Sequence, residues 1–581
     1  MLAEIVCSGF QRPVTVSLFD GLRRLRTPDR MVTAWADAIC INQSDDDEKA
    51  HQVNLMGAIY DRAAEVVVWL GKDSNDLAGA AFEGLITTNT AIQNGTHMSH
   101  SVVPEAFLTL SNGNESQKAA SYPIQQSSSN LRQLLKAQHL TAIKALFQLP
   151  WFTRVWVLQE VGLASEATAF WGNSHIVFSE IAMFILFSMT EENMDFTLGQ
   201  DVKDIISGPP YYAFWNVWST YNKKDSWVVR CPSLKDFSER QASECRIDFL
   251  VVLEASRRFS ATNALDHVFA FLGHPKALVP ATSKPLVQAD YKITLEDLHL
   301  IIASRLAKQS LNFLVQVQNQ PASLGQDCTF SSWIPQWNIN HDDAPTAFWE
   351  AWDASLRATK RPAFDSRLYG TRLHVSALLF DTVVHYTEVM KKSDFDRSSS
   401  GPGDLVEDCW KLTEKAAKLQ PHMYGNNALL SFALTIICHH RSKHTGKEEY
   451  QSLLALFVRF CALYNETFWK ENLEKYGISF LNSHPLSERR IVAQFQEYGT
   501  NRRFFVSDRG YWGLGPSLMQ QGDVCAILFG GDVPFILRPT SKKGQYRFVG
   551  QAYIYGAMYG EVVEKWEGGH ATYEKDDICL I

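Results

Sequence analysis

The fold of the N-terminal region is predicted from residues 35–71, WADAICINQSDDDEKAHQVNLMGAIYDRAAEVVVWLG. VTAWADAI, residues 32–39, is predicted to be a buried strand. Ser44–Asp47 supply good N-cap and first-turn residues for a helix that ends near Ala64. EVVVWLG, residues 65–71, has the β-branched run of a strand that is buried on both faces.

The residues before this stretch continue the alternation of strands and helices. PVTV, residues 13–16, is a short β-prone run, and SLFDGLRRLRTPDR, residues 17–30, places leucines at helical spacing. Short links between alternating strands and helices predict an α/β domain around a parallel sheet with right-handed crossovers.

Polar residues follow the expected strand at its carboxyl end. Asp37, Cys40, Asn42 and Gln43 occupy this position, where open α/β sheets place their ligands. We therefore predict that they line a binding crevice. Asp37 can equally cap the next helix or hold the following turn, whereas Cys40 is more typical of a small core residue than of a nucleophile.

Composition excludes several classes of protein. The formal net charge of -8 over 581 residues argues against broad nucleic-acid binding, which favours a basic face. The longest apolar run, residues 181–189, is far shorter than the ~20 residues that span a bilayer. No signal peptide is visible at the N-terminus, and the ten cysteines form no CxxC pair. We expect a cytoplasmic protein with reduced thiols, no bound nucleic acid and no membrane span.

Changes in residue composition and periodicity along the chain predict five regions. The first is α/β with a Ser-, Asn- and Gly-rich insertion, the middle is mostly helical, and the last is a small antiparallel β module with short β runs between turn residues. The predicted boundaries are 1–175 for the first domain with its insertion at about 93–130, 176–390 for the middle, 391–403 for a linker, 404–488 for a helical segment and 489–581 for the β module.

Common catalytic and metal motifs are absent from the sequence. Cys438, His439, His440 and His444 cluster in CHHRSKH, but adjacent helical histidines diverge and no second ligand pair follows, so we predict no metal site. Neither a Walker sequence nor a G-x-S-x-G elbow occurs.

Two long blocks resemble a known family in order and content. Residues 35–71 and WFTRVWVLQEVGLASEATAFWGN, residues 151–173, are similar to the main blocks of the fungal heterokaryon incompatibility (HET) domain. RRFSATNALDHVFAFLGH, VQADYKITLEDLH, SSWIPQW and the segments from GYWGLGP to AYIYGAMYGE also resemble parts of full-length family members. The family's domain usually opens with a strand carrying a Ser-Tyr-Val-Trp-Gly-like segment, and we expect this first strand to be missing here.

The resemblance implies a role in self/non-self recognition between fungal cells, with growth arrest or programmed cell death as the outcome. It also implies protein partners in an incompatibility system and a homo-oligomer on activation.

Thr153, Trp156 and Glu160, on a helix predicted to begin near Phe152, carry a second resemblance. T-x-x-W-x-x-x-E is similar to the helix motif of Toll/interleukin-receptor (TIR) domains, which have flavodoxin-like parallel sheets and whose glutamate serves NAD-cleaving members. This implies a catalytic role for Glu160, a substrate-binding role for Trp156 beside the residues at the strand end, and NAD as substrate rather than resident cofactor. The residues themselves favour a structural helix carboxylate paired with a nearby base for Glu160 and a core position for Trp156, and Arg154 is expected to face solvent or an interface rather than the site.

Three functions remain open from the sequence. The chain can be a signalling enzyme that hydrolyses NAD once clustered, a non-enzymatic interaction module of the same family, or a degenerate member without toxicity.

Overall fold

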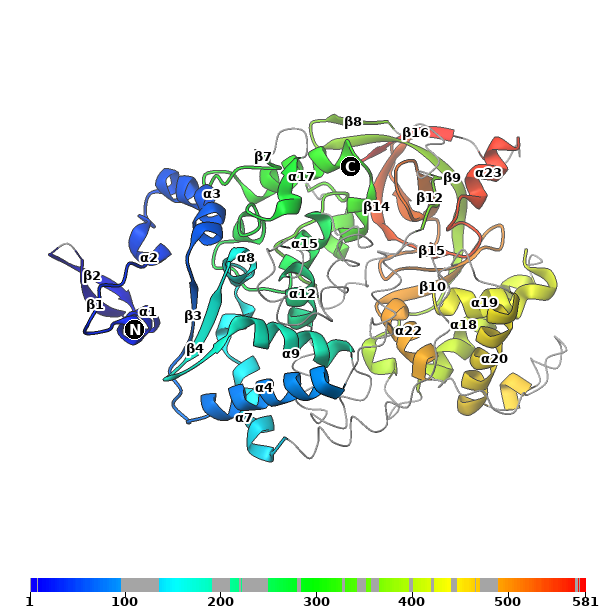
Figure 1. Ribbon diagram of the computed structural model, residues 1–581. Coiled ribbons are helices and arrows are strands. Elements are labelled where there is room, and N and C mark those ends of the chain that lie inside the picture. The colour runs from blue at the N-terminus through cyan, green and yellow to red at the C-terminus, as the bar shows by residue number, and fades with distance from the viewer. Residues whose placement is uncertain are drawn as a thin grey trace. The chain divides into compact units, whose positions relative to one another are not determined.

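The computed structural model consists of two compact units. The first comprises residues Met1–Leu298 and Trp337–Asn340, and the second His299–Gln336 and His341–Ile581 (Figure 1). The structure describes residues 2–7, 9–95, 135–190, 209–218, 221, 249–279, 284–325, 330–341, 352–356, 365–395, 401–418, 423–439, 447–465, 467–470, 489–569, 573 and 575–581.

Helices predominate in the first unit, with short strands between them. Its strands are β1 (Leu2–Cys7), β2 (Phe10–Thr15), β3 (Val66–Gly71), β4 (Ala167–Trp171), β5 (Ser174–Val177), β6 (Leu278–Val279) and β7 (Lys284–Pro285). Its helices are α1 (Val16–Leu25), α2 (Asp37–Cys40), α3 (Asp46–Arg62), α4 (Ala78–Gly95), α7 (Ala137–Phe147), η1 (Pro150–Thr153), α8 (Val157–Leu163), α9 (Phe178–Thr190), α12 (Pro209–Trp218), α15 (Phe249–Ser256), α16 (Asp266–Phe269) and η2 (Pro275–Ala277). Helix α17 (Leu295–Ala307) runs across the point where the second unit begins.

A small mixed sheet forms the centre of this α/β unit. β3 pairs with β4 in parallel, and β4 pairs with β5 antiparallel, in the order β3-β4-β5. Among the described strands of this unit, the predicted parallel pairing is therefore present in one pair, β3–β4. Burial alternates along β3, with Val66, Val68 and Leu70 buried while Val67 is 37% exposed, so the prediction that both faces are buried is wrong for this strand.

Helices pack on both faces of the sheet. α1 covers one face, because a Cβ on Gly21 would lie 3.1 Å from the Trp69 ring and the Arg24 guanidinium lies over the Phe170 ring. The opposite face contacts α4, where Phe82 meets Trp171 edge to face. This arrangement confirms that helices alternate with strands around a central sheet in this part of the chain.

The strand expected at residues 32–39 does not form. Residues 31–36 have no regular structure and are largely exposed, and Asp37 begins the one-turn helix α2 instead of ending a strand. The physical reason is the lack of a neighbour, since among the described strands none pairs with this segment and an unpaired strand leaves its backbone groups unsatisfied. By contrast, α1 and α3 confirm the two predicted helices, and α3 is capped by Asp45, whose carboxylate accepts the N–H groups of Asp47 and Glu48.

The helix predicted to begin near Phe152 is also displaced. Phe152 lies in the 3-10 turn η1, and α8 begins only at Val157. Between them Arg154 is extended and bridges to Ser260, whose carbonyl accepts the Val155 N–H at 3.0 Å, and a turn leads into α8. A tertiary contact with a distant segment therefore interrupts the helical periodicity, and Thr153, Trp156 and Glu160 do not share one helix.

The second unit combines a helical group with a large sheet. Its helices are η3 (Asn312–Gln316), η4 (Pro321–Leu324), η6 (Lys392–Phe395), α18 (Gly401–Ala417), η7 (Gly425–Asn427), α19 (Ala428–Ile436), α20 (Lys447–Tyr464), α22 (Arg489–Gly499) and α23 (Glu561–Glu567). Its strands are β8 (Ser366–Tyr369), β9 (Arg372–Tyr386), β10 (Arg502–Ser507), β11 (Trp512–Pro516), β12 (Val524–Leu528), β13 (Phe535–Pro539), β14 (Gln545–Gln551), β15 (Tyr553–Ile554) and β16 (Lys575–Leu580).

Five of these strands close into a barrel. The order β12-β13-β14-β16-β9 is completed by pairing between β12 and β9, and only the β14–β16 pair is parallel. The long strand β9 also pairs with β10, which leads to β11 and β15. The predicted antiparallel β texture is thus confirmed for the C-terminal region, with β9 contributed by the chain before residue 391.

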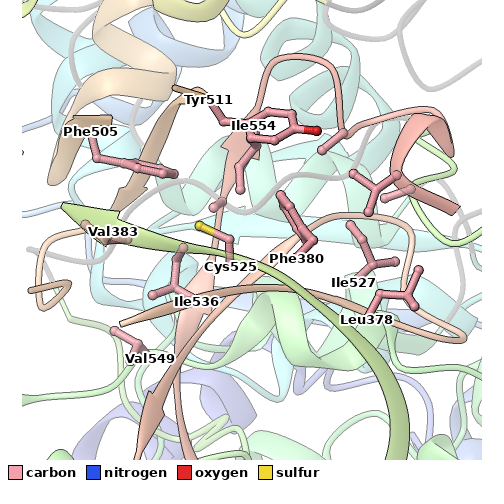
Figure 2. Close-up of a cluster of buried hydrophobic side chains, with 14 of the residues drawn as sticks. Leu378, Phe380, Val383, Phe505, Tyr511, Cys525, Ile527, Ile536, Val549 and Ile554 are labelled. Atoms are coloured by element: carbon pink, nitrogen blue, oxygen red, sulfur yellow. The ribbon is translucent and has the colours of Figure 1, made fainter. Parts of the chain in front are cut away.

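Buried apolar side chains from these strands meet in one core. Figure 2 shows Phe380 of β9, Ile527 of β12, Ile536 of β13 and Val549 of β14 drawn together with Tyr511. All five are at most 3% exposed. Inward-facing residues from alternate positions fill the interior, as in other small barrels.

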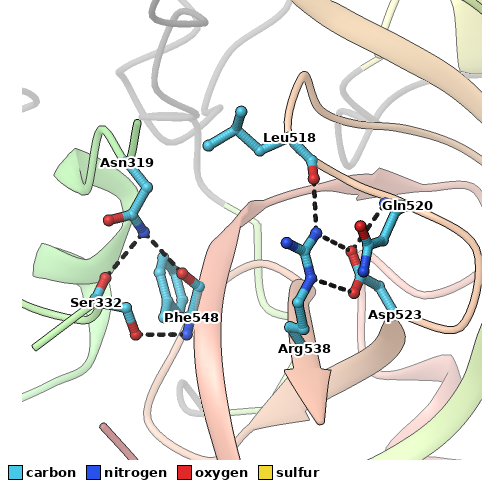
Figure 3. Close-up of polar contacts among 7 residues, drawn as sticks. All are labelled: Asn319, Ser332, Leu518, Gln520, Asp523, Arg538 and Phe548. Atoms are coloured by element: carbon cyan, nitrogen blue, oxygen red, sulfur yellow. Dashed lines mark hydrogen bonds and ion pairs between the residues drawn. The ribbon is translucent and has the colours of Figure 1, made fainter. Parts of the chain in front are cut away.

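Hydrogen bonds from polar side chains hold loops against the barrel strands. Figure 3 shows Arg538 donating from Nε and Nη2 to both carboxylate oxygens of Asp523 at 2.9 Å, while Nη2 also donates to the Leu518 carbonyl. Asn319 donates to the carbonyls of Ser332 and Phe548. Because Asp523 is only 1% exposed, this charge depends on its guanidinium partner.

Two further predictions meet the limits of the described residues. The insertion expected at about 93–130 lies outside them, apart from the end of α4. Within the part of the chain that is described, no helix has the length and apolar character needed to cross a membrane.

Candidate functional site

The site begins with a close approach of α3 and α8. A Cβ on Gly57 of α3 would lie 3.0 Å from the Gly273 Cα, so only glycine fits there without movement of the backbone. The Gly273 N–H donates at 3.1 Å to the side chain of Gln159, which is 1% exposed on α8. Tyr60 lies about one turn after Gly57 and Glu160 follows Gln159, so this packing brings the two helices' polar side chains near each other.

Glu160 has an unusual electrostatic environment. Burial raises the pKa of its carboxyl from 4.5 to about 7, the guanidinium of Arg154 opposes this rise, and the carboxylate of Asp37 adds to it. The residue is partly buried in the first turn of α8. Among the described residues, none donates a hydrogen bond to its carboxyl group, so burial prevails over the single nearby cation.

The same three charged groups act on Tyr60. Burial raises the pKa of the Tyr60 phenol, Glu160 and Asp37 raise it further, and Arg154 opposes them. The Trp35 ring meets the Tyr60 ring edge to face at 5.8 Å between centroids. Asp37, Tyr60, Arg154 and Glu160 therefore form one electrostatic cluster, which we call the Glu160 cluster, with Trp35 against its tyrosine.

The residues predicted at the strand end separate into two groups. Asp37 is exposed at the start of α2, where its Oδ1 accepts the Ala38 N–H at 2.7 Å, and it belongs to the Glu160 cluster. Gln43 donates from Nε2 to the Asp37 carbonyl at 3.2 Å, and Asn42 accepts from the hydroxyl of Ser44. These two side chains thus hold the local turn.

Cys40 has an exposed side chain, so its interpretation as a small core residue is wrong. Within the described part of the chain, no hydrogen bond or charge interaction joins Cys40 or Asn42 to Glu160.

Trp156 is the N-cap residue of α8, directly before the helix. Its carbonyl accepts the N–H groups of Gln159 at 3.1 Å and Glu160 at 3.2 Å. Its indole N–H donates at 3.1 Å to the carboxylate of Asp266, which is 7% exposed. The indole of Trp156 is therefore engaged in a structural hydrogen bond.

Sequence reasoning missed two members of the cluster. Tyr60 belongs to no recognised motif, and the one signal that could have marked it is that a phenol on a packed helix face needs a partner for its hydroxyl. Arg154 was expected to face away from the site. Arg154 is exposed, as expected, and its charge nevertheless lowers the pKa of Glu160.

The chemistry available to this cluster follows from its charges. A carboxyl group with a pKa near 7 changes charge at neutral pH, and it can exchange a proton or stabilise a developing positive charge. Among the described residues, no group of three or more His, Cys, Asp or Glu side chains is arranged to hold a metal ion.

Comparisons with known proteins agree with this architecture. The family model of the heterokaryon incompatibility protein (HET) matches residues 3–160, and that of the Het-6 β-barrel domain matches residues 435–571. The first region is thus similar to the fungal HET domain and the last to the Het-6 barrel domain, and these matches support a role in heterokaryon incompatibility.

A full-length relative extends this result. The chain is 22% identical over 597 residues to heterokaryon incompatibility protein 6, OR allele, of Neurospora crassa, covering 94% of this chain and 83% of the relative. No solved structure matches the chain.

Proposed function

We propose that the first unit hydrolyses the bond between nicotinamide and ribose in NAD, or in a related nucleotide, when copies of the chain cluster. Loss of the nucleotide then produces growth arrest or programmed cell death in incompatible fungal cells. The observation that carries this proposal is the electrostatic environment of Glu160, whose pKa burial raises to about 7 with a further contribution from Asp37 of the other sequence block.

Glycosidic cleavage needs a negative charge at a defined place. As the C–N bond breaks, nicotinamide leaves with the bonding electrons and the ribosyl group becomes positive. A Glu160 carboxylate in a partly buried position stabilises that charge more strongly than a hydrated one does. Water then adds to the ribosyl carbon and releases a proton.

Other members of the Glu160 cluster have roles consistent with this reaction. The exposed guanidinium of Arg154 is suited to the diphosphate of a dinucleotide, since arginine binds phosphate oxygens in a forked geometry. Trp35 and Tyr60 present aromatic rings beside the carboxylates, and such rings stack on nucleotide bases. Trp156, held by Asp266, supports the helix that carries Glu160. In this proposal Cys40, Asn42 and Gln43 form the adjacent turn.

A second function is favoured by a different observation. The four most exposed large hydrophobic side chains of the described residues are Met31 at 95%, Val6 at 73%, Leu2 at 71% and Phe10 at 69%. Three of them belong to the β1–β2 hairpin, and exposed apolar side chains can be buried by a protein partner. The unit would then recruit partners without cleaving any nucleotide.

Expression of the full chain in fungal cells separates these functions. Wild type, Glu160→Gln and the matched control Glu166→Gln, which changes an exposed carboxylate nearby, are compared for total NAD and for growth. The first proposal predicts that NAD falls before growth stops in wild type and in the control, and that neither occurs in Glu160→Gln. Growth arrest by Glu160→Gln with unchanged NAD contradicts it and favours the interaction module. No arrest with any variant identifies a member without toxicity.

A further inference from the structure

A buried aspartate outside the matched HET segment joins two parts of the first unit. Asp266 accepts a hydrogen bond from the Trp156 indole N–H at Oδ2, 3.1 Å away, and from the Tyr291 hydroxyl at Oδ1, 2.7 Å away. Both carboxylate oxygens are therefore in use, and each donor is an uncharged group. Burying a carboxylate in this way is costly, since burial raises the pKa of Asp266 despite these bonds.

The Trp156 bond reaches the start of α8. The main chain of Trp156 accepts the Glu160 N–H, so the position of this residue sets the first turn of the helix. An N-cap normally holds that turn with a side-chain oxygen, which tryptophan lacks. The indole bond to Asp266 replaces it as the anchor of this end of α8.

The Tyr291 bond reaches α3 through residues 289–292. The Lys49 ammonium of α3 lies 3.9 Å from the centre of the Tyr291 ring. Asn54 of α3 makes two hydrogen bonds with the main chain of Ala289. Asp266 thus stands between the helix that carries Glu160 and a segment fastened along the helix that carries Tyr60.

We propose that Asp266 is a positioning residue that holds Trp156 and Tyr291 so that α8 presents Glu160 to Asp37 and Tyr60. The working domain then includes residues 266–291, beyond the matched segment 3–160. This inference rests on the proposed function for its catalytic meaning, but the geometry that it describes is tested without NAD.

Asp266→Asn in the full chain is the primary test. Asparagine keeps one carbonyl oxygen and replaces the other acceptor by an NH2 donor, so the indole and the phenol can no longer donate to two separate oxygens. We expect the start of α8 to loosen and water to reach Glu160, which lowers its pKa by about 1 unit toward the ordinary value. The titration is followed by NMR of carboxyl-labelled glutamate, with the Glu160 signal assigned from its loss in Glu160→Gln.

Two further variants make this test specific. Asp290→Asn removes one negative charge from the same segment at an exposed position, and it should leave the Glu160 titration unchanged. In Asp266→Asn/Tyr291→Phe the asparagine carbonyl is left to Trp156, so the Glu160 pKa should return toward the wild-type value. Tyr291→Phe alone should lower it slightly, and this variant serves if Asp266→Asn does not fold.

The outcomes distinguish the two proposals. A Glu160 titration that is unchanged in folded Asp266→Asn, or in Tyr291→Phe where the asparagine variant does not fold, assigns Asp266 a purely structural role and overturns the inference. A shifted titration in a protein that never cleaves NAD supports the positioning role and refutes the proposed function. If wild type cleaves NAD and Asp266→Asn cleaves it equally well with an unchanged Glu160 pKa, only the positioning role fails.

Discussion

Replacement of Glu160 by Gln should stabilise the first unit relative to wild type, and this difference in unfolding free energy should grow as the pH rises. In wild type the unfolded chain releases this proton near pH 4.5, whereas the folded protein holds it until about pH 7. The raised pKa means that the stability contributed by the neutral carboxyl is fully present below pH 4.5 and is lost as the pH rises through 7. Gln stays neutral throughout, so this loss is absent from the variant.

The magnitude follows from the size of the shift. Each unit of pKa difference corresponds to about 1.4 kcal/mol, so the full effect is about 3 kcal/mol above pH 8. Between about pH 5 and about pH 8 the difference in unfolding free energy between Glu160→Gln and wild type should therefore grow by roughly 2.5 kcal/mol.

Urea unfolding of the full chain measures this difference. Each cooperative transition is fitted separately, because two units need not unfold together. Glu166→Gln controls for the loss of one surface charge nearby. A difference between Glu160→Gln and wild type that stays constant from about pH 5 to about pH 8 would refute the argument that burial and Asp37 raise the Glu160 pKa.

The remaining predictions concern the packing of α3, the barrel and the charges around Glu160. Gly57→Ala should destabilise the first unit by about 1–3 kcal/mol, because its Cβ meets backbone, whereas Gly79→Ala on α4, whose Cβ would make only an ordinary contact with Ser174 Oγ at 4.0 Å, should be neutral or stabilising; urea midpoints compare them. Arg538→Met should destabilise the second unit by about 3–5 kcal/mol through its buried carboxylate partner, and Arg367→Met at an exposed ion pair should leave the melting temperature unchanged. Arg154→Ala removes a nearby cation and should raise the Glu160 pKa in an NMR titration; a fall would contradict the electrostatic cluster.

Local patterns in the sequence predicted the helices well. Residues 16–25 and 46–62 form helices as their periodicity and capping residues indicate, because these signals lie within the segments themselves. The strand predicted at residues 32–39 does not form, because a strand needs a neighbouring strand and no local pattern specifies that neighbour. The start of α8 at Val157 depends on the bridge between Arg154 and Ser260, which lie far apart in the sequence.

The candidate site was predictable in part. Resemblance to TIR domains singled out Glu160, the expected strand end singled out Asp37, and Asp37 contributes to the raised pKa of Glu160. Tyr60 and Arg154 were not found, because their place beside Glu160 depends on how closely α3 and α8 approach. That approach requires a contact between Gly57 and Gly273, a pairing of two distant glycines that leaves no mark in the pattern of either segment.

Release of nicotinamide by the purified full-length protein is the direct test of NAD cleavage by the Glu160 cluster. The chain is clustered on a lipid surface through an affinity tag, and nicotinamide is quantified by chromatography over a range of pH. We predict cleavage by wild type that rises about tenfold between about pH 6 and about pH 8 as Glu160 ionises, and no cleavage by Glu160→Gln. Equal nicotinamide release by both proteins, or none by clustered wild type, would show that Glu160 does not catalyse NAD cleavage.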